Sequence, residues 1–385
     1  MIKIKRHSDL LRNDVVNEKN LPRVSDFYSN NEHILNHSAK IYLRPMGLVF
    51  GEDARSLIAA GLAGALGGMG HIGFTLVQVI ERDGSVRRDI VPYTEVSSHT
   101  LMSLHVMPRP KFGGIDVSAC RIMGIVNVTP DSFSDGGNLS SPEAAIAHGR
   151  LLSEEGADIL DIGGESTRPG SDTLDDRDES IRVLPVIEGL LGVQVVSADT
   201  RKATVMRAAL EAGATIINDV SALTYDVASA GVIANANCPV ILMHAQGEPK
   251  TMQLNPRYDD VVLDVYDGLL DRVQSAVAAG IALENICIDP GIGFGKSFAQ
   301  NLQLMANLTV FHGLGLPLLV GLSRKGFVGA VTGEKPASVR VHGSVGGALQ
   351  AAMNGAHILR VHDVKATRAA LSMFTASNDP DSVDV

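Results

Sequence analysis

The stretch VQVVSADTRKATVMRAALEAGATIINDV (193–220) holds one complete unit of the pattern that decides the fold. An apolar run ends in Ser-Ala-Asp-Thr, a helix-like segment follows and closes on Gly213, and a second apolar run begins at once. Both runs are continuously apolar, as strands are when both faces of a parallel sheet are buried. The stretch therefore predicts a strand, a helix and a second, parallel strand.

The same unit recurs on both sides of this stretch, between residues 121 and 376. Eight apolar runs alternate with helix-like segments: RIMGIVNVT (121–129), ADILDIGG (157–164), VQVVSADT (193–200), TIINDV (215–220), PVILMHA (239–245), ICIDPGIG (286–293), PLLVGLS (317–323) and HILRVHD (357–363). Eight repeats in roughly 250 residues is the length of a (β/α)8 barrel. We therefore predict an α/β protein with a TIM barrel, and an open doubly wound sheet is the alternative.

The chain is expected to divide near residue 118, because residues 1–118 carry 14 Lys and Arg against 12 Asp and Glu, whereas the remainder carries 19 against 31. We predict an N-terminal extension over 1–118, polar and loosely ordered at first and then a small α+β segment. The barrel is expected over 119–377 and a solvated acidic tail over 378–385. Within the extension, TLVQVIERDGSVRRDIVPYTEV (75–96) predicts two strands about a turn at Asp83-Gly84. No activity follows from this region.

One segment of the extension is long and uncharged enough to suggest a membrane span. No formally charged side chain occurs from Ser56 to Ile80. The glycines and His71 of GLAGALGGMGHIG (61–73) weaken a membrane helix. A small-residue helix followed by a strand, FTLVQVI (74–80), is therefore the prediction, with a membrane span as the alternative.

Composition bears on compartment and partners. The basic start MIKIKRHSDL is not followed by an apolar region, so no signal peptide is expected. The three cysteines, Cys120, Cys238 and Cys287, are predicted to be buried core thiols, and their odd number and wide spacing argue against a disulfide framework or a zinc site. A reducing cytoplasm is the expected location. The net charge of −10, the absence of Trp and the 4% aromatic content argue against nucleic acid as a partner.

Polar residues end every one of the eight apolar runs. In a (β/α)8 barrel these ends form the active-site face. The residues are Asn127, Gly164 with ESTRPGS (165–171), Asp199, Asn218-Asp219, His244, Asp289, Ser323-Arg324-Lys325 and Arg360 to Asp363. Any one of them could serve as a cap or turn residue, but together they predict an active site. The loops TPDSFSDGG (129–137) and ESTRPGS are predicted to be lids.

Two groups of these residues suggest the kind of ligand. Arg360 and His362 are two residues apart on one strand, so their side chains point to the same side. A guanidinium beside an imidazole suits a diphosphate or a carboxylate ligand, and a salt bridge within the protein is the alternative for Arg360. The opposite rim is expected to carry a mixture of donors and acceptors from Asp199, Asn218, Asp289 and Lys325. That mixture suits a flat, amide-bearing heterocycle.

Two other signals lead to weaker predictions. PGIGFGKS (290–297) resembles a phosphate-binding P-loop, but Pro290 stands where that pattern needs Gly, so nucleotide binding is not predicted. No cluster of metal ligands is evident. A Mg²⁺ held mainly by substrate phosphates and one or two protein oxygens remains compatible with the sequence.

The motifs together resemble the dihydropteroate synthase family. The matching segments are MGIVNVTPDSFSDGG (123–137), DIGGESTRPGS (161–171), SADT (197–200), INDV (217–220), MH (243–244), DPGIGFGK (289–296), SRKGF (323–327) and RVHD (360–363). They follow one another in the family's order, and residues 1–118 fall mostly outside the resemblance. The resemblance implies a (β/α)8 barrel of folate biosynthesis that joins 4-aminobenzoate to 7,8-dihydropterin-6-ylmethyl diphosphate. It also implies Mg²⁺ as cofactor, a homodimer and inhibition by sulfonamides.

The resemblance also assigns roles to individual residues. The pterin would be bound by Asp199, Asn218, Met243, Asp289 and Lys325. The diphosphate would be bound by Asn127, Thr167, Arg360 and His362. The 4-aminobenzoate would be bound by Thr167, Arg168, Pro169, Phe294 and Gly326. The metal would be bound by Asn127 and Asp135, and catalytic roles would fall to Asp135, Arg168 and Lys325.

The chemistry implied is a dissociative, SN1-like substitution in which Asp135 stabilises the cation and the aniline nitrogen attacks. Two alternatives share the pterin site. One is a pterin-dependent methyltransferase that acts on a corrinoid protein, and the other is a pterin-binding paralogue without activity.

Overall fold

The computed structural model describes residues 40–96, 99–128, 141–166, 173–247 and 251–380. The chain divides into an N-terminal unit, residues 1–109 with 309–315, and a barrel unit, residues 110–308 with 316–385. The polar start of the chain and most of the acidic tail lie outside the described residues. The last helix, α13 (Val364–Asn378), reaches into the range expected for the tail.

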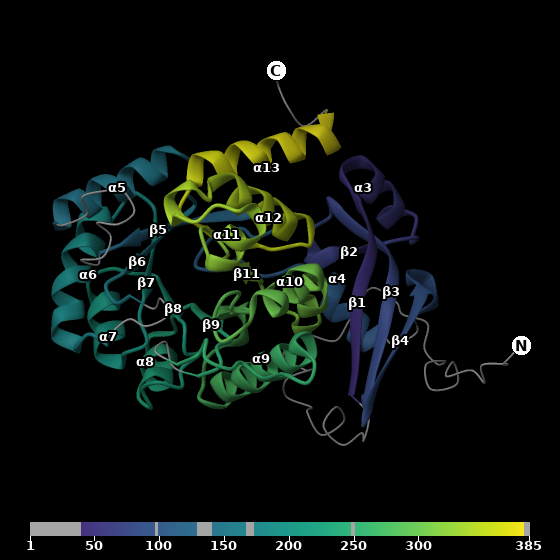
Figure 1. Ribbon diagram of the computed structural model, residues 1–385, viewed down its shortest axis with the longest axis horizontal. Coiled ribbons are helices and arrows are strands. Elements are labelled where there is room, and N and C mark those ends of the chain that lie inside the picture. The colour runs from purple at the N-terminus through teal and green to yellow at the C-terminus, as the bar shows by residue number, and fades with distance from the viewer. Residues whose placement is uncertain (1–39, 97–98, 129–140, 167–172, 248–250, 381–385) are drawn as a thin grey trace, which may run out of the picture. The chain divides into compact units, whose positions relative to one another are not determined.

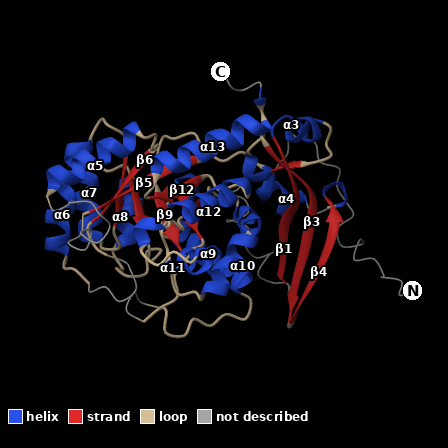
Figure 2. Cartoon of the chain, turned by 45° about the horizontal axis from the view of Figure 1, so that its top comes forward, coloured by secondary structure: helices blue, strands red, loops and turns tan. Residues whose placement is uncertain are grey.

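The N-terminal unit is built on an antiparallel sheet, drawn as red arrows in Figure 2. Its central strand, β3 (Ile72–Asp83), pairs with β1 (Lys40–Phe50), β2 (Gly64–Ala65) and β4 (Ser85–Pro92). Asp83 lies opposite Ser85, and the intervening Gly84 has a φ of +65°, which confirms the predicted turn. The helices α3 (Gly51–Ala59) and α4 (His99–Val106), with short 3₁₀ turns at Leu66–Gly68 and Tyr93–Glu95, complete the α+β unit.

The small-residue segment 61–73 differs from its prediction. The helix α3 ends at Ala59, before this segment, and the segment forms β2 and the 3₁₀ turn. Gly61, Gly67 and Gly68 have φ values of +72°, +62° and +78°, which a right-handed helix cannot contain. The predicted strand over 74–80 is confirmed within β3. Among the residues described, no helix has the length and apolar character needed to cross a bilayer.

The barrel unit contains eight parallel strands, which confirms the predicted barrel (Figure 1). They are β5 (Arg121–Asn127), β6 (Ile159–Gly163), β7 (Val195–Asp199), β8 (Ile216–Asp219), β9 (Val240–Met243), β10 (Ile286–Asp289), β11 (Leu319–Val320) and β12 (Ile358–Val361). Hydrogen-bonded neighbours run from β10 back to β5 and then to β12 and β11. A parallel bridge between Ile288 and Leu318 joins the two ends of this order, so the open-sheet alternative is wrong.

Helices follow the strands and surround them in Figure 1. They are α5 (Pro142–Glu154), α6 (Asp176–Leu190), α7 (Ala203–Glu211), α8 (Ser229–Ala236), α9 (Val261–Ala278), α10 (Phe298–Ala306), α11 (Gly326–Thr332), α12 (Val341–Met353) and α13, with 3₁₀ turns at Leu283–Asn285 and Ala337–Val339. A further 3₁₀ turn, Leu308–Leu314, belongs to the N-terminal unit from Thr309 onward. Side chains of Ser141 and Asp260 accept hydrogen bonds from the first backbone N–H groups of α5 and α9. Gly156 and Gly213 have positive φ just after α5 and α7, where a helix commonly ends.

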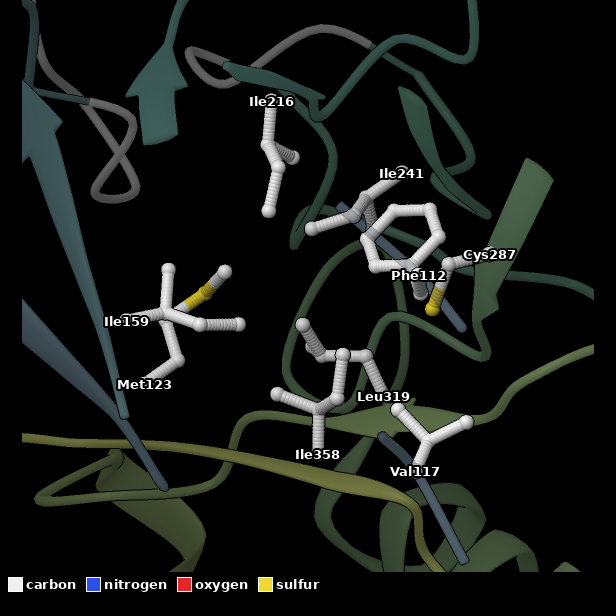
Figure 3. Close-up of a cluster of buried hydrophobic side chains, with 9 residues drawn as sticks. All are labelled: Phe112, Val117, Met123, Ile159, Ile216, Ile241, Cys287, Leu319 and Ile358. Atoms are coloured by element: carbon white, nitrogen blue, oxygen red, sulfur yellow. The ribbon is translucent and has the colours of Figure 1, made fainter. Parts of the chain in front are cut away.

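The barrel core is an apolar layer, shown in Figure 3. Seven of its side chains come from the strands: Met123, Ile159, Ile216, Ile241, Cys287, Leu319 and Ile358. Phe112 and Val117 complete the layer from a turn in which Phe112 and Ile115 pair. Residues 110–118 therefore pack with the barrel, and the observed division at Pro110 lies upstream of the expected one.

The three cysteines are free thiols. Cys238 and Cys287 are buried, as predicted, whereas Cys120 is partly exposed, so the expectation of a fully buried thiol is wrong there. Burial raises the pKa of the Cys238 thiol to about 12, which keeps it protonated and unreactive near neutral pH.

Candidate active site

Two cavities lie at the carboxyl ends of the barrel strands. The larger has a volume of about 690 Å³ and the smaller about 50 Å³. Six residues line both, so the two are continuous: Asp199, Phe294, Ser323, Lys325, Arg360 and His362. Asp199, Arg360 and His362 lie at or next to a strand end, Ser323 and Lys325 stand on the segment between β11 and α11, and Phe294 stands on the loop after β10. The predicted convergence of the strand ends on one site is therefore present.

The smaller cavity contains every residue to which the resemblance gave a pterin role. Asp199, Asn218, Met243 and Asp289 are the last or next-to-last residues of β7 to β10, and Lys325 directly precedes α11. The four strand residues are less than 10% exposed. They combine carboxylate acceptors, an amide and an ammonium donor around one small space, which suits a flat heterocycle with both donors and acceptors on its edge.

Arg360 of β12 connects the two groups of residues that were expected on opposite rims. Its Nε donates to Asp161 Oδ2 at 2.6 Å, and its Nη2 donates to Asp199 Oδ2 at 2.7 Å. The separation of rims is therefore wrong, and the alternative of a salt bridge is present in the structure. Arg360 lines both cavities, and its two bonds to carboxylates hold the planar guanidinium in a fixed orientation there.

Asp161 in the middle of β6 is the principal site residue that the sequence analysis missed. Its side chain is fully buried, and Oδ2 accepts from both Arg360 and Asn218 Nδ2, the latter at 3.0 Å. The bond to Asp161 determines which way the Asn218 amide faces. A carboxylate inside an otherwise apolar strand, ILDIG, was the signal available, because buried acidic residues need a partner.

The Asp161→Asn substitution tests this arrangement. Asparagine keeps an acceptor oxygen but removes the negative charge that faces Arg360. Its NH₂ group would occupy the position of Asp161 Oδ1, an atom without a hydrogen-bond partner among the described residues. We expect the free energy of unfolding to fall by about 1.5–3 kcal/mol and pterin affinity to fall by about tenfold. Urea unfolding and calorimetry measure the two effects.

Asp158→Asn is the matched control, because Asp158 also accepts from an arginine, Arg368, and from a backbone N–H, that of Ile122, but these partners line neither cavity, whereas Arg360 and Asn218, the partners of Asp161, line the smaller one. Its pterin affinity should equal that of the wild type. Wild-type pterin affinity in the Asp161 variant would contradict the orienting role.

Asp289, Lys325 and the loop after β10 form the other side of the smaller cavity. Asp289 Oδ1 accepts from the Gly291 N–H at 2.7 Å. Lys325 Nζ donates to the Ile292 carbonyl and lies 4.5 Å from the centre of the Phe294 ring. Burial raises the pKa of Asp289, whereas burial and then the charge of Arg360 lower the pKa of Lys325 to about 8, against the opposing pull of Asp289.

Burial also raises the pKa of Asp199, because removal from water disfavours a carboxylate and Asp161 adds a second negative charge. Arg360 opposes both effects. Acidic groups with raised pKa values and a lysine with a lowered one, gathered in one cavity, are typical of a functional site.

The larger cavity brings together the predicted residues Asn127, Phe294, Gly326 and His362. His362 is oriented by Ser323, whose Oγ lies 3.1 Å from Nδ1 of the ring. Asp135, Thr167, Arg168 and Pro169 lie outside the described residues, as do most of both predicted lid loops. Their roles stay predictions.

Three of the polar residues predicted at strand ends, Asp219, His244 and Arg324, are bonded to other protein groups, and Arg324 alone of the three lines a cavity. Asp219 accepts from the backbone and hydroxyl of Ser221 in a turn. His244 faces Lys296, and Arg324, although at the wall of the larger cavity, forms a two-point salt bridge with Asp363 at 2.7 and 3.1 Å. Capping and pairing therefore explain these positions.

Glu165 is a further wall residue of the larger cavity to which the sequence analysis gave no role. Its carboxylate accepts from Arg201 at 3.0 Å, Lys202 at 3.2 Å and the Leu174 N–H at 2.9 Å. The bond to Leu174 joins the two sides of the segment 166–173. These bonds lower the pKa of Glu165 although burial opposes them, so it stays ionised.

Comparison with known proteins agrees with this geometry. The model of the family described as pterin binding enzyme matches residues 123–362. The dihydropteroate synthase of Neisseria meningitidis serogroup C is 48% identical over 279 residues, which are 71% of this chain and 98% of that protein.

Two solved structures are also similar. Dihydropteroate synthase of Xanthomonas albilineans with 4-aminobenzoic acid is 49% identical, with a TM-score of 0.65, over 70% of this chain and 96% of that one. The Yersinia pestis dihydropteroate synthase with a sulfonamide drug is 45% identical, with a TM-score of 0.66, over 68% and 96%. The chain therefore belongs to the pterin-binding enzyme family, among the dihydropteroate synthases of folate biosynthesis.

Proposed function

We propose that this chain joins (7,8-dihydropterin-6-yl)methyl diphosphate to 4-aminobenzoate and forms 7,8-dihydropteroate and diphosphate. The observation that carries the proposal is the smaller cavity, where Asp199, Asn218 and Asp289 converge beside Lys325. A pterin presents amino and ring N–H donors on one edge and a ring carbonyl beside them. Carboxylates would accept from the donors, and the lysine would donate to the carbonyl.

The diphosphate would lie toward the larger cavity, against Arg360, His362, Asn127 and Thr167. Arg360 supplies a planar set of donors, which suits phosphate oxygens. The part of the chain that the structure describes has no group of three or more His, Cys, Asp or Glu side chains suited to a metal. Asn127 offers one neutral oxygen at the cavity wall, which fits a Mg²⁺ held mostly by phosphate oxygens, with Asp135 as a second ligand. Bound Mg²⁺ would neutralise charge on the diphosphate.

The substitution proceeds in two stages. The bond between the pterin methylene and the diphosphate oxygen breaks first, and the electron pair leaves with the diphosphate, whose charge Arg360 and His362 stabilise. Asp135 stabilises the cation left on the dihydropterin. The aniline lone pair then forms the new C–N bond, and the positively charged nitrogen transfers a proton to water. An Asp135→Ala variant with unchanged turnover would contradict the role of that residue.

The 4-aminobenzoate would occupy the larger cavity beside Phe294 and Gly326, with Thr167, Arg168 and Pro169 from the second loop. Lys325 stands at the boundary of the two cavities. It can therefore contact both substrates, which is why we assign it a catalytic role. The protein contributes mainly orientation and electrostatic stabilisation, because the aniline nitrogen needs no prior deprotonation.

The direct test is diphosphate release by the purified full-length chain with the pterin diphosphate, 4-aminobenzoate and Mg²⁺. We expect release that requires both substrates and falls when the metal is chelated. Sulfonamides should compete with 4-aminobenzoate and not with the pterin diphosphate. Absence of diphosphate release at every enzyme concentration would refute the synthase activity of this chain.

We further propose that the protein is a homodimer in the cytoplasm. Sedimentation of the purified protein measures the oligomeric state.

The pH dependence of turnover follows from Lys325. Its pKa is lowered to about 8. Only the protonated ammonium has three N–H groups with which to donate hydrogen bonds to the pterin and to the loop. The charged form exists below the pKa, so kcat/KM for the pterin diphosphate should fall as the pH rises through about 8. Lys325→Arg should remove this decline, because arginine stays protonated throughout. A decline that persists unchanged in the arginine variant would assign it to another group.

A further inference from the structure

The segment PGIGFGKS (290–297), which resembles a P-loop, contains the most deeply buried lysine of the described residues. Lys296 is 1% exposed although it stands at the wall of the larger cavity. Its Nζ lies 3.0 Å from the carbonyl oxygens of both Gly291 and Phe294. It also lies 3.2 Å from the His244 carbonyl oxygen and 3.1 Å from His244 Nδ1. The ammonium is therefore enclosed by acceptors of its own loop and of the segment after β9.

The loop is held closely against that segment. A Cβ atom added at Gly291 would lie 1.9 Å from the His244 carbonyl oxygen, and one added at Gly295 would lie 2.2 Å from that of Gln246. Both glycines have positive φ. Side chains at either position are therefore excluded, and the loop backbone can approach the end of β9 only because these residues are glycine.

The loop held in this way carries one residue of the proposed aminobenzoate site and contacts a second residue, the catalytic lysine. Phe294 belongs to it, and Lys325 donates to its Ile292 carbonyl while facing the Phe294 ring. Asp289, which precedes the loop, is bound to it through the Gly291 N–H. A shift of the loop would therefore move the ring and release the ammonium of Lys325.

We propose that Lys296 is a positioning residue for the aminobenzoate step: its ammonium fastens the 290–297 loop to the end of β9 and so places Phe294 and Lys325. The inference rests on the proposed function. Lys296 touches no substrate in this scheme. It acts through the loop carbonyl groups, in contrast to the lysine of a P-loop, which binds phosphate.

The charge state of Lys296 supports the same role. Burial, and then the charge of Lys325, lowers its pKa to about 7, against the opposing pull of Asp289. Burial and Lys296 lower the pKa of His244 to about 3, so the ring is neutral and can accept at Nδ1. His244 follows β9, Asp289 ends β10 and Lys325 directly precedes α11. Tyr258 packs against the His244 ring and donates its hydroxyl to the Gly295 carbonyl of the same loop, and burial raises its pKa, so it stays neutral over this pH range. An ammonium has three protons for its four neighbouring acceptors, whereas the neutral amine has two, so the loop is held less firmly above pH 7.

The experiment compares wild type, Lys296→Met and Lys296→Arg in the diphosphate-release assay between pH 6 and 9. Lys365→Met, a loss of an exposed lysine on α13, is the control and should behave as the wild type. For Lys296→Met we expect the KM for 4-aminobenzoate to rise about tenfold or more, as loss of a charged hydrogen-bond donor predicts. The KM for the pterin diphosphate should change less than the KM for 4-aminobenzoate.

The pH profile separates positioning from a general loss of structure. In the wild type the KM for 4-aminobenzoate should rise as the pH passes about 7. Lys296→Arg should remove this rise. The decline of kcat/KM for the pterin diphosphate near pH 8, which we assign to Lys325, should remain. A KM within twofold of wild type in Lys296→Met, or an unchanged rise in Lys296→Arg, would overturn the proposal. If the methionine variant does not fold, the arginine variant and the wild-type profile decide.

A second measurement does not depend on activity. NMR titration of the His244 ring should show a higher pKa in Lys296→Met, because the neighbouring positive charge is gone. If the wild type releases no diphosphate, the proposed synthase function is refuted. Independently of that result, an unchanged His244 pKa in Lys296→Met would refute the contact between Lys296 and His244 on which the positioning role depends.

Discussion

Asp289→Ala is expected to abolish measurable pterin binding. Asp289 is 6% exposed at the end of β10, and one of its oxygens is engaged with the Gly291 N–H. The carboxylate is also the counter-charge of Lys325, whose pKa it supports. Alanine would remove the acceptor of the Gly291 N–H and of the pterin donors, and it would remove the negative charge that faces the Lys325 ammonium. Because removal of one partner of a buried, hydrogen-bonded charged contact with a ligand costs about 2–5 kcal/mol of binding free energy, pterin affinity should fall by about a hundredfold or more.

Calorimetry with the pterin diphosphate measures this loss. Asp289→Asn keeps the shape and one acceptor, so it should bind more weakly than the wild type and more tightly than alanine. Asp271→Ala, an exposed aspartate on α9, is the control and should bind normally. Affinity within tenfold of wild type in the alanine variant would mean that the pterin edge is recognised elsewhere.

Arg360→Met is expected to lose both stability and turnover. Arg360 joins two buried carboxylates, Asp161 and Asp199, and burial already opposes the ionisation of Asp199. Removing the guanidinium leaves two negative charges next to each other away from water, which should lower the free energy of unfolding by about 3–5 kcal/mol. The diphosphate would also lose a donor, which should reduce kcat by about a hundredfold to a thousandfold.

Urea unfolding and diphosphate release distinguish the two effects. Arg360→Lys restores the charge, but one ammonium cannot reproduce the two-point contact, so intermediate values are expected for both quantities. Arg368→Met is the matched control, since Arg368 also pairs with a carboxylate, Asp158, but is partly exposed and lines neither cavity. It should leave turnover unchanged. Normal turnover in folded Arg360→Met would exclude this residue from the diphosphate site.

Much of the fold could be predicted because local composition determines it. Continuous apolar runs separated by amphipathic segments allow few arrangements other than a parallel sheet with helices. The polar residues that end those runs, such as Asp199 and Asp289, could be assigned to the site because the carboxyl ends of barrel strands share one face. The segment 61–73 was misread because its composition does not reveal which glycines adopt positive φ.

The partners within the site were not predictable in this way. Asp161 lies inside an apolar run, and its partner Arg360 is 199 residues away along the chain. Lys296 received no role from the sequence, since its motif does not show whether the ammonium faces outward or into its own loop. Two further candidates have other roles in the structure. Asp219 caps a turn, and Arg324 forms a salt bridge with Asp363.

The amino-acid sequence by itself determined the strands, the helices and the edge of the barrel where polar groups gather, because hydrophobic periodicity and strand-end positions are local properties. Only the tertiary structure decided which buried charges face one another. Closure of the barrel brings β12 next to β5 and so places Arg360 against Asp161 and Asp199. Charge pairing in a buried site depends on distances through space, which spacing along the chain does not specify.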